Sequence, residues 1–151
     1  MATLKTGDKA PSFALQDASG STVKLSDFSG HKCLLYFYPK ADTPGCTKQS
    51  CAIRDAKQPL REANIQGIGI SPDTPAKLAK FDEKYQLGFS LLSDTDHTVA
   101  EAYGAWGEKS MCGKTYMGII RSSFLIDENG LISEAWYKVK PLDTVTNVLD
   151  Q

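Results

Sequence analysis

The residues with the clearest chemical potential are two cysteines, Cys46 and Cys51, which follow an apolar segment and a proline-containing turn. Thr43-Pro44-Gly45 predicts a turn into a helix, so Cys46 falls in the first helical turn. Free backbone N–H groups and the positive end of the helix dipole favour a thiolate at such a position. A thiol whose pKa falls from about 8.5 to about 6 becomes roughly thirty times richer in thiolate at neutral pH. Cys46 is therefore the candidate nucleophile.

The spacing between Cys46 and Cys51 limits how the two can react with each other. Residues five apart in an intact α-helix have Cα atoms about 8.6 Å apart, on different sides of the cylinder. A disulfide needs Cα atoms within about 4.4 to 6.8 Å. A bond between them therefore requires at least one helical turn to unwind, and such a disulfide would be a conformational switch as well as a redox event.

The other cysteines have less specific surroundings. Cys33 begins an apolar segment, where a free cysteine typically packs in the core. Cys112 stands beside Gly113 in a segment with no clear period, so an incidental surface thiol is expected, with an auxiliary redox role as the alternative.

A metal site is not expected. Structural zinc sites use pairs of ligands two to four residues apart together with a second pair, and Cys46 and Cys51 do not have this spacing. His31 and His97 do not supply the missing ligands, and we expect surface or turn roles for both. No metal site is therefore predicted.

The candidate nucleophile must be positioned by the elements around it. The apolar residues from Cys33 to Tyr38 predict a strand buried on both faces, which Pro39 ends. Residues 65–71 predict a second buried strand, and 89–92 a short one. Hairpins are expected over 7–25 and over 119–126 with 131–137, and a loop over 105–118. Four helices are expected. The first follows Cys46, with a kink or a restart near 57–58 because of Pro59. The second begins at Thr74-Pro75, the third spans 95–103, and the fourth begins at Pro141.

This order of elements predicts an α/β fold in which a mixed central sheet is flanked by helices, with an N-terminal β-hairpin and an antiparallel hairpin at one edge of the sheet. A chain of 151 residues is long enough to bury roughly 70% of the surface that its unfolded form exposes. We expect residues 1–151 to form a single domain.

Composition excludes several classes of function. The net charge is −1, with 17 basic and 18 acidic residues interspersed, which gives no electrostatic case for nucleic acid or an anionic membrane. The longest apolar run is far too short for a membrane span. Four unevenly spaced cysteines do not suggest a secreted disulfide scaffold, so they are expected to be reduced at rest in a cytoplasmic protein.

Specific residues also indicate a family. Pro39, Thr43 and Cys46 form Pro-x-x-x-Thr-x-x-Cys, which resembles the active-site motif of the peroxiredoxins. The segment 38–47, with Cys51 following, resembles their bacterioferritin comigratory protein, or Q-type, subfamily. The likeness extends along nearly the whole chain, through residues 7–11, 69–71, 91–94, 103–109 and 121–127.

The resemblance implies a thioredoxin-like fold and the reduction of hydrogen peroxide or organic hydroperoxides without a metal or organic cofactor. It makes Cys46 the peroxidatic nucleophile, which becomes a sulfenic acid. Thr43 would offer its hydroxyl to the peroxide, and Arg121 a fixed charge that favours the thiolate and the developing oxyanion. Pro39 would shield the sulfur from water.

By the same resemblance, Cys51 is the resolving cysteine of an atypical 2-Cys enzyme, which forms an intramolecular disulfide with Cys46. Thioredoxin is the expected reductant, with glutaredoxin as the alternative, and the expected state is a monomer or weak dimer. Two residues depart from the pattern: Gln49 is neutral where many relatives carry Glu, and Pro59 interrupts the following helix.

Two other functions compete with this interpretation. A protein disulfide oxidoreductase places a cysteine at the same strand-to-helix junction, but its C-x-x-C signature is missing because Gln49 stands three residues after Cys46. A non-catalytic chaperone or binding module could also use this fold.

Overall fold

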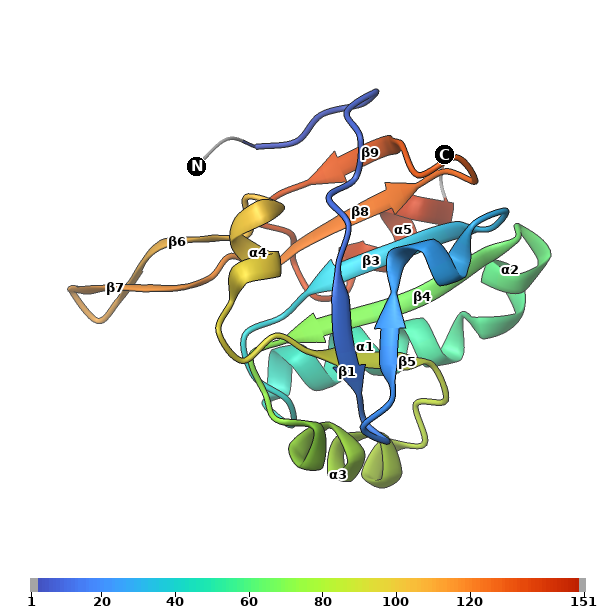
Figure 1. Ribbon diagram of the computed structural model, residues 1–151. Helices are drawn as coiled ribbons and strands as arrows, with labels where there is room; N and C mark the ends of the chain where they lie inside the picture. Colours follow the sequence, from blue (N-terminus) through green and yellow to red (C-terminus); the bar gives the residue numbers. More distant parts are fainter. Residues whose placement is uncertain (1–2, 150–151) are drawn as a thin grey trace.

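A central sheet of seven strands organises the molecule, in the order β2-β1-β5-β4-β3-β8-β9 (Figure 1). The computed structural model describes residues 3–149. The strands of this sheet are β1 (Ala14–Asp17), β2 (Thr22–Lys24), β3 (Lys32–Phe37), β4 (Ile65–Ser71), β5 (Ser90–Ser93), β8 (Ser122–Ile126) and β9 (Ile132–Trp136).

Strand β3 lies in the interior of the sheet. It pairs in parallel with β4 and antiparallel with β8, while the hairpins β1–β2 and β8–β9 form the two edges. Residues 33–37 are all buried, as expected for a strand covered on both faces. The mixed sheet and the N-terminal hairpin that the sequence predicts are confirmed. The sequence predicts a hairpin at one edge of the sheet, and the structure has one at each edge.

The two faces of β3 look into two separate apolar clusters, because successive side chains of a strand point to opposite sides. Cys33, Leu35 and Phe37 belong to one cluster, which also contains residues of the short helix α4 (Thr98–Ala102). Leu34 and Tyr36 belong to the other. The helices that contribute to this second cluster are α1 (Pro44–Asp55), α2 (Lys57–Glu62), α3 (Pro75–Tyr85) and α5 (Asp143–Leu149).

The interruption predicted near 57–58, as a kink or a restart, is confirmed and is a restart. Helix α1 ends at Asp55 and α2 begins at Lys57, with Ala56 between them in a near-helical conformation (φ −92°, ψ 12°). Pro59 is the third residue of α2. The N–H groups of the first helical turn have no partner within the helix, so proline can stand there without the loss of an internal hydrogen bond. Among the described residues, no helix is both long and apolar enough to cross a membrane.

The loop predicted over 105–118 is wrong. The segment forms a two-stranded antiparallel ribbon, β6 (Trp106–Met111) and β7 (Lys114–Ile119), which projects from the body of the molecule (Figure 1). Cys112 and Gly113 connect the strands with positive φ angles of 52° and 79°, as a tight hairpin turn requires. Cysteine is uncommon in such a turn, so the sequence carried no clear hairpin signal at Cys112. Because most of β7 is exposed, its residues also lack the alternation of apolar and polar side chains that predicts a strand.

Several predicted boundaries also move. The helix predicted over 95–103 shortens to α4, because the buried Asp94 carboxylate accepts hydrogen bonds from the N–H groups of Val99 and Ala100 and fixes the start. The strand predicted from Ile119 begins at Ser122, because Ile119 ends β7 instead. The short strand predicted over 89–92 lies one residue later, as β5.

The C-terminal helix also starts later than predicted, at Asp143 rather than Pro141. Leu142, just before this helix, is 59% exposed, and Leu149 at its end is 37% exposed. Thr144 and Val148 are the residues that this helix buries, and Thr144 is buried because its hydroxyl has a polar partner on α1.

Burial sets the reactivity of Cys33, whose predicted core position is confirmed. Removal from water disfavours the thiolate and raises the pKa of the Cys33 thiol to about 12, above its ordinary value of 9.0. Because the raised pKa belongs to the folded state, the resulting stabilisation is complete below the unfolded-state pKa. It is lost as the pH rises through the folded-state value.

We therefore expect Cys33 to resist iodoacetamide at pH 8 to 9 in the native protein and to react once the chain is unfolded in urea. Peptide mapping by mass spectrometry measures the modification, with the exposed Cys112 as an internal control that should label in both states. Labelling of native Cys33 as fast as Cys112 would contradict this assignment.

Candidate active site

Cys46 lies at the start of α1, directly beyond the end of β3. Thr43 is extended (φ −101°, ψ 158°) and precedes Pro44 at the first helical position, so Cys46 is the third residue of the helix. The residue is fully buried, in the cluster that contains Tyr36 and Tyr38. The predicted position in the first helical turn is confirmed.

Arg121 reaches this thiol from a distant part of the sequence. It stands between the end of β7 and the start of β8, and its Nη2 donates to the Cys46 Sγ at 3.4 Å. The sheet register explains the approach, because Ser122 pairs with Phe37 at the end of β3 from which the chain runs to α1. The structure thus brings together two of the predicted site residues.

Gln49 holds the guanidinium in place. Its Oε1 accepts a hydrogen bond from Arg121 Nη1 at 2.6 Å, and its Nε2 donates to Thr144 Oγ1 at 2.8 Å. Gln49 and Thr144 are fully buried. An amide can accept and donate at once without a charge, so Arg121 is fixed without a carboxylate competing for its positive charge.

The positioning roles of Gln49 and Thr144 were not predicted. The sequence drew attention to Gln49 only as a neutral residue in a position that is often acidic. Its spacing of three from Cys46 was a usable signal, because residues i and i+3 share a helix face. Thr144 gave no comparable signal, since its contact depends on how α5 packs against α1.

Gly45 leaves the space that Arg121 occupies. A Cβ atom added at Gly45 would lie 3.1 Å from Arg121 Nη2 and 3.5 Å from Pro141 Cγ. The Arg121 carbonyl also accepts a hydrogen bond from Val139 N at 2.9 Å, which fixes the backbone of this residue from the other side.

Thr43 and Pro39 lie in the loop that joins β3 to α1. The Thr43 hydroxyl donates to the Lys40 carbonyl at 2.8 Å and does not cap the helix. Its hydrogen is therefore engaged, and its oxygen lone pairs are left as acceptors. Pro39 is partly buried and directly follows the buried Tyr38.

Side chains near helix α3 fix the same loop. Ala41 N donates to the Asp73 carboxylate at 2.7 Å. The Asp42 carboxylate accepts from Tyr85 Oη at 2.6 Å and from Lys84 Nζ at 2.9 Å, and these two donors lower the pKa of Asp42, with Tyr85 the larger cause. Asp42 has a positive φ of 60°, a conformation that these contacts help to hold.

Tyr36 connects α1 to the sheet. Its hydroxyl shares a buried 2.8 Å hydrogen bond with Ser50 Oγ, and burial raises the pKa of the Tyr36 phenol well above its ordinary value. The opposite residue of β4 is Gly69, where an added Cβ would lie 2.7 Å from the Tyr36 oxygen. Glycine at this position makes room for a neutral tyrosine beneath α1.

Lys109 adds a second positive charge near the site. Partial burial and then the charge of Arg121 lower the pKa of Lys109, while Cys46 acts in the opposite direction. Its ammonium group lies 6.0 Å from the centre of the Tyr116 ring on the paired strand β7. Strand β6 therefore brings a cation toward Cys46 and Arg121.

Cys51 is on the same helix as Cys46 and is partly buried. All four cysteines are free thiols. Since α1 is continuous from Pro44 to Asp55, the helical separation of about 8.6 Å between the Cα atoms of Cys46 and Cys51 applies.

The histidines are remote from these contacts. His31 Nδ1 lies 2.9 Å from Asn64 Oδ1, and His97 stacks on Trp106 with 3.7 Å between ring centres. Within residues 3–149, no three His, Cys, Asp or Glu side chains are grouped so as to hold a metal ion. Three pockets of about 320, 460 and 650 Å³ have linings that do not include Cys46.

Comparisons with known proteins give a consistent result. A family model described as the AhpC/TSA family matches residues 6–135. Peroxiredoxin Bcp of Escherichia coli (strain K12) is 54% identical over 136 residues, which cover 90% of this chain and 87% of the relative.

Solved structures are also similar. The peroxidoxin BcpB of Mycobacterium tuberculosis superposes with a TM-score of 0.86 at 34% identity, over 97% of this chain and 95% of that one. The bacterioferritin comigratory protein of Xanthomonas campestris has a TM-score of 0.85 at 33% identity, covering 91% and 88%. Its structures with a trapped intermediate and ligand concern alkyl peroxide reduction.

The contact at Gly45 yields a direct test of Arg121 placement. In Gly45→Ala the added methyl group should displace the guanidinium and slow alkylation of Cys46 by iodoacetamide several-fold. The free energy of unfolding should change by no more than about 1 kcal/mol, because the better helix propensity of alanine offsets the disturbance of the Arg121–Gln49 hydrogen bond. Rates come from peptide mapping and stability from urea unfolding.

A double-mutant comparison isolates the cause. In an Arg121→Gln background, Gly45→Ala should leave the alkylation rate nearly unchanged, because no guanidinium remains to be displaced. An equal slowing in both backgrounds would show that Gly45 acts independently of Arg121.

Proposed function

The chain belongs to the AhpC/TSA family, as a peroxiredoxin of the bacterioferritin comigratory or Q-type group, and we propose that Cys46 is the nucleophile with which it reduces hydrogen peroxide and organic hydroperoxides. The observation that carries this assignment is the contact between Arg121 Nη2 and the Cys46 Sγ at the N-terminus of α1. Two sources of positive potential, the guanidinium and the helix end, meet at one sulfur.

The first chemical step transfers one oxygen atom. The Cys46 thiolate attacks one peroxide oxygen, so that an S–O bond forms while the O–O bond breaks. The leaving oxygen takes a proton and departs as water or an alcohol, and Cys46 is oxidised to a sulfenic acid. Arg121 and the free N–H groups of the first helical turn stabilise the negative charge that develops on oxygen.

Thr43 and Pro39 act on the substrate side of the sulfur. Because the Thr43 hydroxyl already donates to Lys40, it can accept a hydrogen bond from the O–H of the peroxide and orient it. Pro39 offers no N–H and limits the access of water. Since Cys46 is fully buried, the loop that carries both residues must open slightly to admit a peroxide.

Cys51 resolves the sulfenic acid. Its thiolate attacks the Cys46 sulfur, an S–S bond forms, and the S–O bond breaks, so that hydroxide leaves and takes up a proton to become water. The helical separation of the two residues is too large for this bond, so α1 must unwind locally before closure. A thioredoxin dithiol then reduces the disulfide by exchange, which makes the enzyme an atypical 2-Cys peroxiredoxin.

The context of the reaction is also part of the proposal. The proposed site consists of Pro39, Thr43, Cys46, Cys51 and Arg121, all from one chain. This supports a single domain that acts as a monomer or weak dimer. We place the protein in the cytoplasm.

Peroxide reduction is tested by stopped-flow mixing of the reduced protein with hydrogen peroxide, followed by Trp fluorescence and intact mass. We expect rapid loss of two hydrogen atoms per chain, with Cys46 linked to Cys51 on peptide mapping. Cys46→Ser should abolish turnover, because within residues 3–149 Arg121 is hydrogen-bonded to no other thiol. Robust turnover by Cys46→Ser would defeat the assignment, and an insulin-reduction assay should detect no disulfide oxidoreductase activity.

The resolving role of Cys51 has its own signature. Cys51→Ser should undergo one fast oxidation, retain a single added oxygen, and recycle poorly with thioredoxin. The unmodified protein should lose far-UV helical circular dichroism on oxidation, whereas Cys51→Ser should not, because its helix has no disulfide to form. Identical spectra of the reduced and oxidised unmodified protein would contradict the unwinding step.

A further inference from the structure

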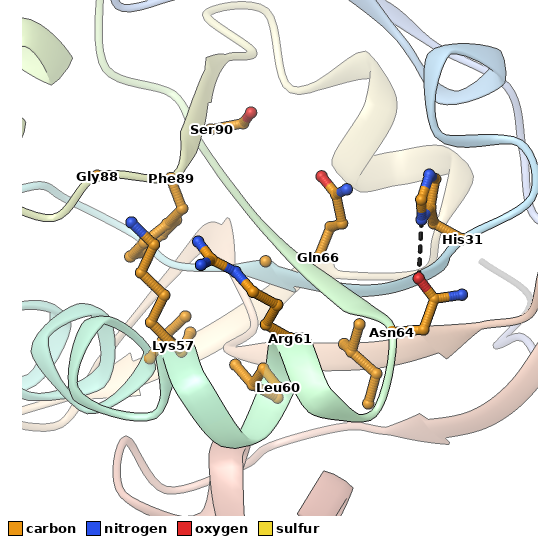
Figure 2. A pocket seen from close by; sticks show the side chains of 12 residues that line it. His31, Lys57, Leu60, Arg61, Asn64, Gln66, Gly88, Phe89 and Ser90 are labelled. Atoms are coloured by element: carbon orange, nitrogen blue, oxygen red, sulfur yellow. Dashed lines mark hydrogen bonds between the residues drawn. The ribbon is translucent and has the colours of Figure 1, made fainter.

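A pocket of about 460 Å³ opens beside α2, where the end of α1, the start of β4 and residues 88–90 meet (Figure 2). Its lining does not include Cys46, Cys51, Thr43, Pro39, Arg121 or Gln49. Ile53, Leu60 and Ile65 supply buried apolar surface, and Phe89 is partly buried beside them. The volume is within the range of small-molecule sites.

The charge on this pocket is uncompensated. Its lining contains Lys57 and Arg61 but no Asp or Glu, in a chain with 18 acidic residues. Lys57 and Arg61 are four positions apart on α2, and Figure 2 shows both side chains extending toward Phe89 with their charged ends on the same side of the pocket. No hydrogen bond or ion pair joins either side chain to another residue within 3–149.

A second pocket provides a contrast. It has about 650 Å³ and is lined by four lysines, but Asp42, Asp73 and Glu83 stand among them. Lys84 there is paired with Asp42 at 2.9 Å. Carboxylates therefore offset the lysines of this second pocket, whereas the lining of the pocket beside α2 contains no carboxylate. Two like charges at i and i+4 destabilise a helix slightly when no anion lies between them.

The wall around the two cations is well fixed. Asn64 follows α2 with a positive φ of 60°, and its side chain meets His31 at 2.9 Å. Beneath them, a Cβ at Gly67 would lie 3.1 Å from Ile53 Cγ2 and 3.9 Å from Phe89, so glycine lets the floor pack closely. Gln66 and Ser90 add polar side chains to the lining.

We propose that this pocket binds a small organic anion, with a phosphate or carboxylate group held by Lys57 and Arg61 and a compact apolar or aromatic body against Leu60 and Phe89. Arg61 can hold either group through two parallel hydrogen bonds, and Lys57 adds a point charge. The apolar surface selects for an organic anion over a free inorganic one. The pocket shares no residue with the group proposed to act on peroxide, although Ile53 of α1 lies in its lining.

The test uses the reduced protein and two probes, phenyl phosphate and benzoate, with amide chemical shifts recorded by NMR. We expect at least one probe to saturate, with shifts confined to residues 57–67 and 88–90. The probe that binds more tightly identifies the head group. Absence of saturation by both probes, or equally tight binding of the neutral analogue phenol, would overturn the proposal.

Charge-removal variants localise the binding. Lys57→Gln combined with Arg61→Gln should weaken it about tenfold or more, since charged hydrogen bonds are lost. Lys77→Gln with Lys80→Gln removes the same charge at the other pocket and should leave binding unchanged. Equal weakening in both double variants would show that binding depends only on the net charge of the protein, and it would contradict the proposed site. Lys57→Arg, which keeps the charge, should retain binding and guards against a folding defect in the double variant.

Discussion

The contact between the Arg121 guanidinium and the Cys46 sulfur is the interaction on which the site depends. It exists because β8 pairs antiparallel with β3, which carries Arg121 to the end of β3 from which α1 is reached. Gln49, Thr144 and Gly45 then determine where the guanidinium rests. The geometry at one sulfur is therefore a product of sheet register, helix packing and the absence of one methyl group.

Helix α1 has two requirements that oppose each other. It must be ordered to present Cys46, and the buried Tyr36–Ser50 hydrogen bond and the packing of Ile53 on Gly67 supply that order. The proposed disulfide requires the same helix to open. Few of its residues are deeply buried, namely Cys46, Gln49, Ser50 and Ile53, which keeps the anchoring of α1 modest compared with that of β3.

Sequence patterns predicted most features that depend on neighbouring residues along the chain. The burial of β3, the helical start at Cys46 and the break before Pro59 follow from periodicity and proline geometry, and all three are confirmed. The ribbon β6–β7 was missed because its turn contains Cys112 and most of β7 faces solvent. The supporting contact of Thr144 was also missed, since it depends on packing between helices that no single segment encodes. The meeting of Cys46 and Arg121 was expected only from the family resemblance, for the same reason.

The break at Ala56 bounds the segment that has to melt. Helix α1 has 12 residues and α2 has 6, and Ala56 separates them with φ −92° and ψ 12°. Fraying that begins at Cys46 can therefore stop at Ala56 instead of propagating into α2, so the cooperative unit is one short helix. In the proposed mechanism, the sulfenic acid at Cys46 persists only as long as this unit takes to open. Under that proposal the local stability of α1, more than that of the whole domain, sets how long Cys46 is exposed to a second peroxide and to irreversible sulfinic acid formation.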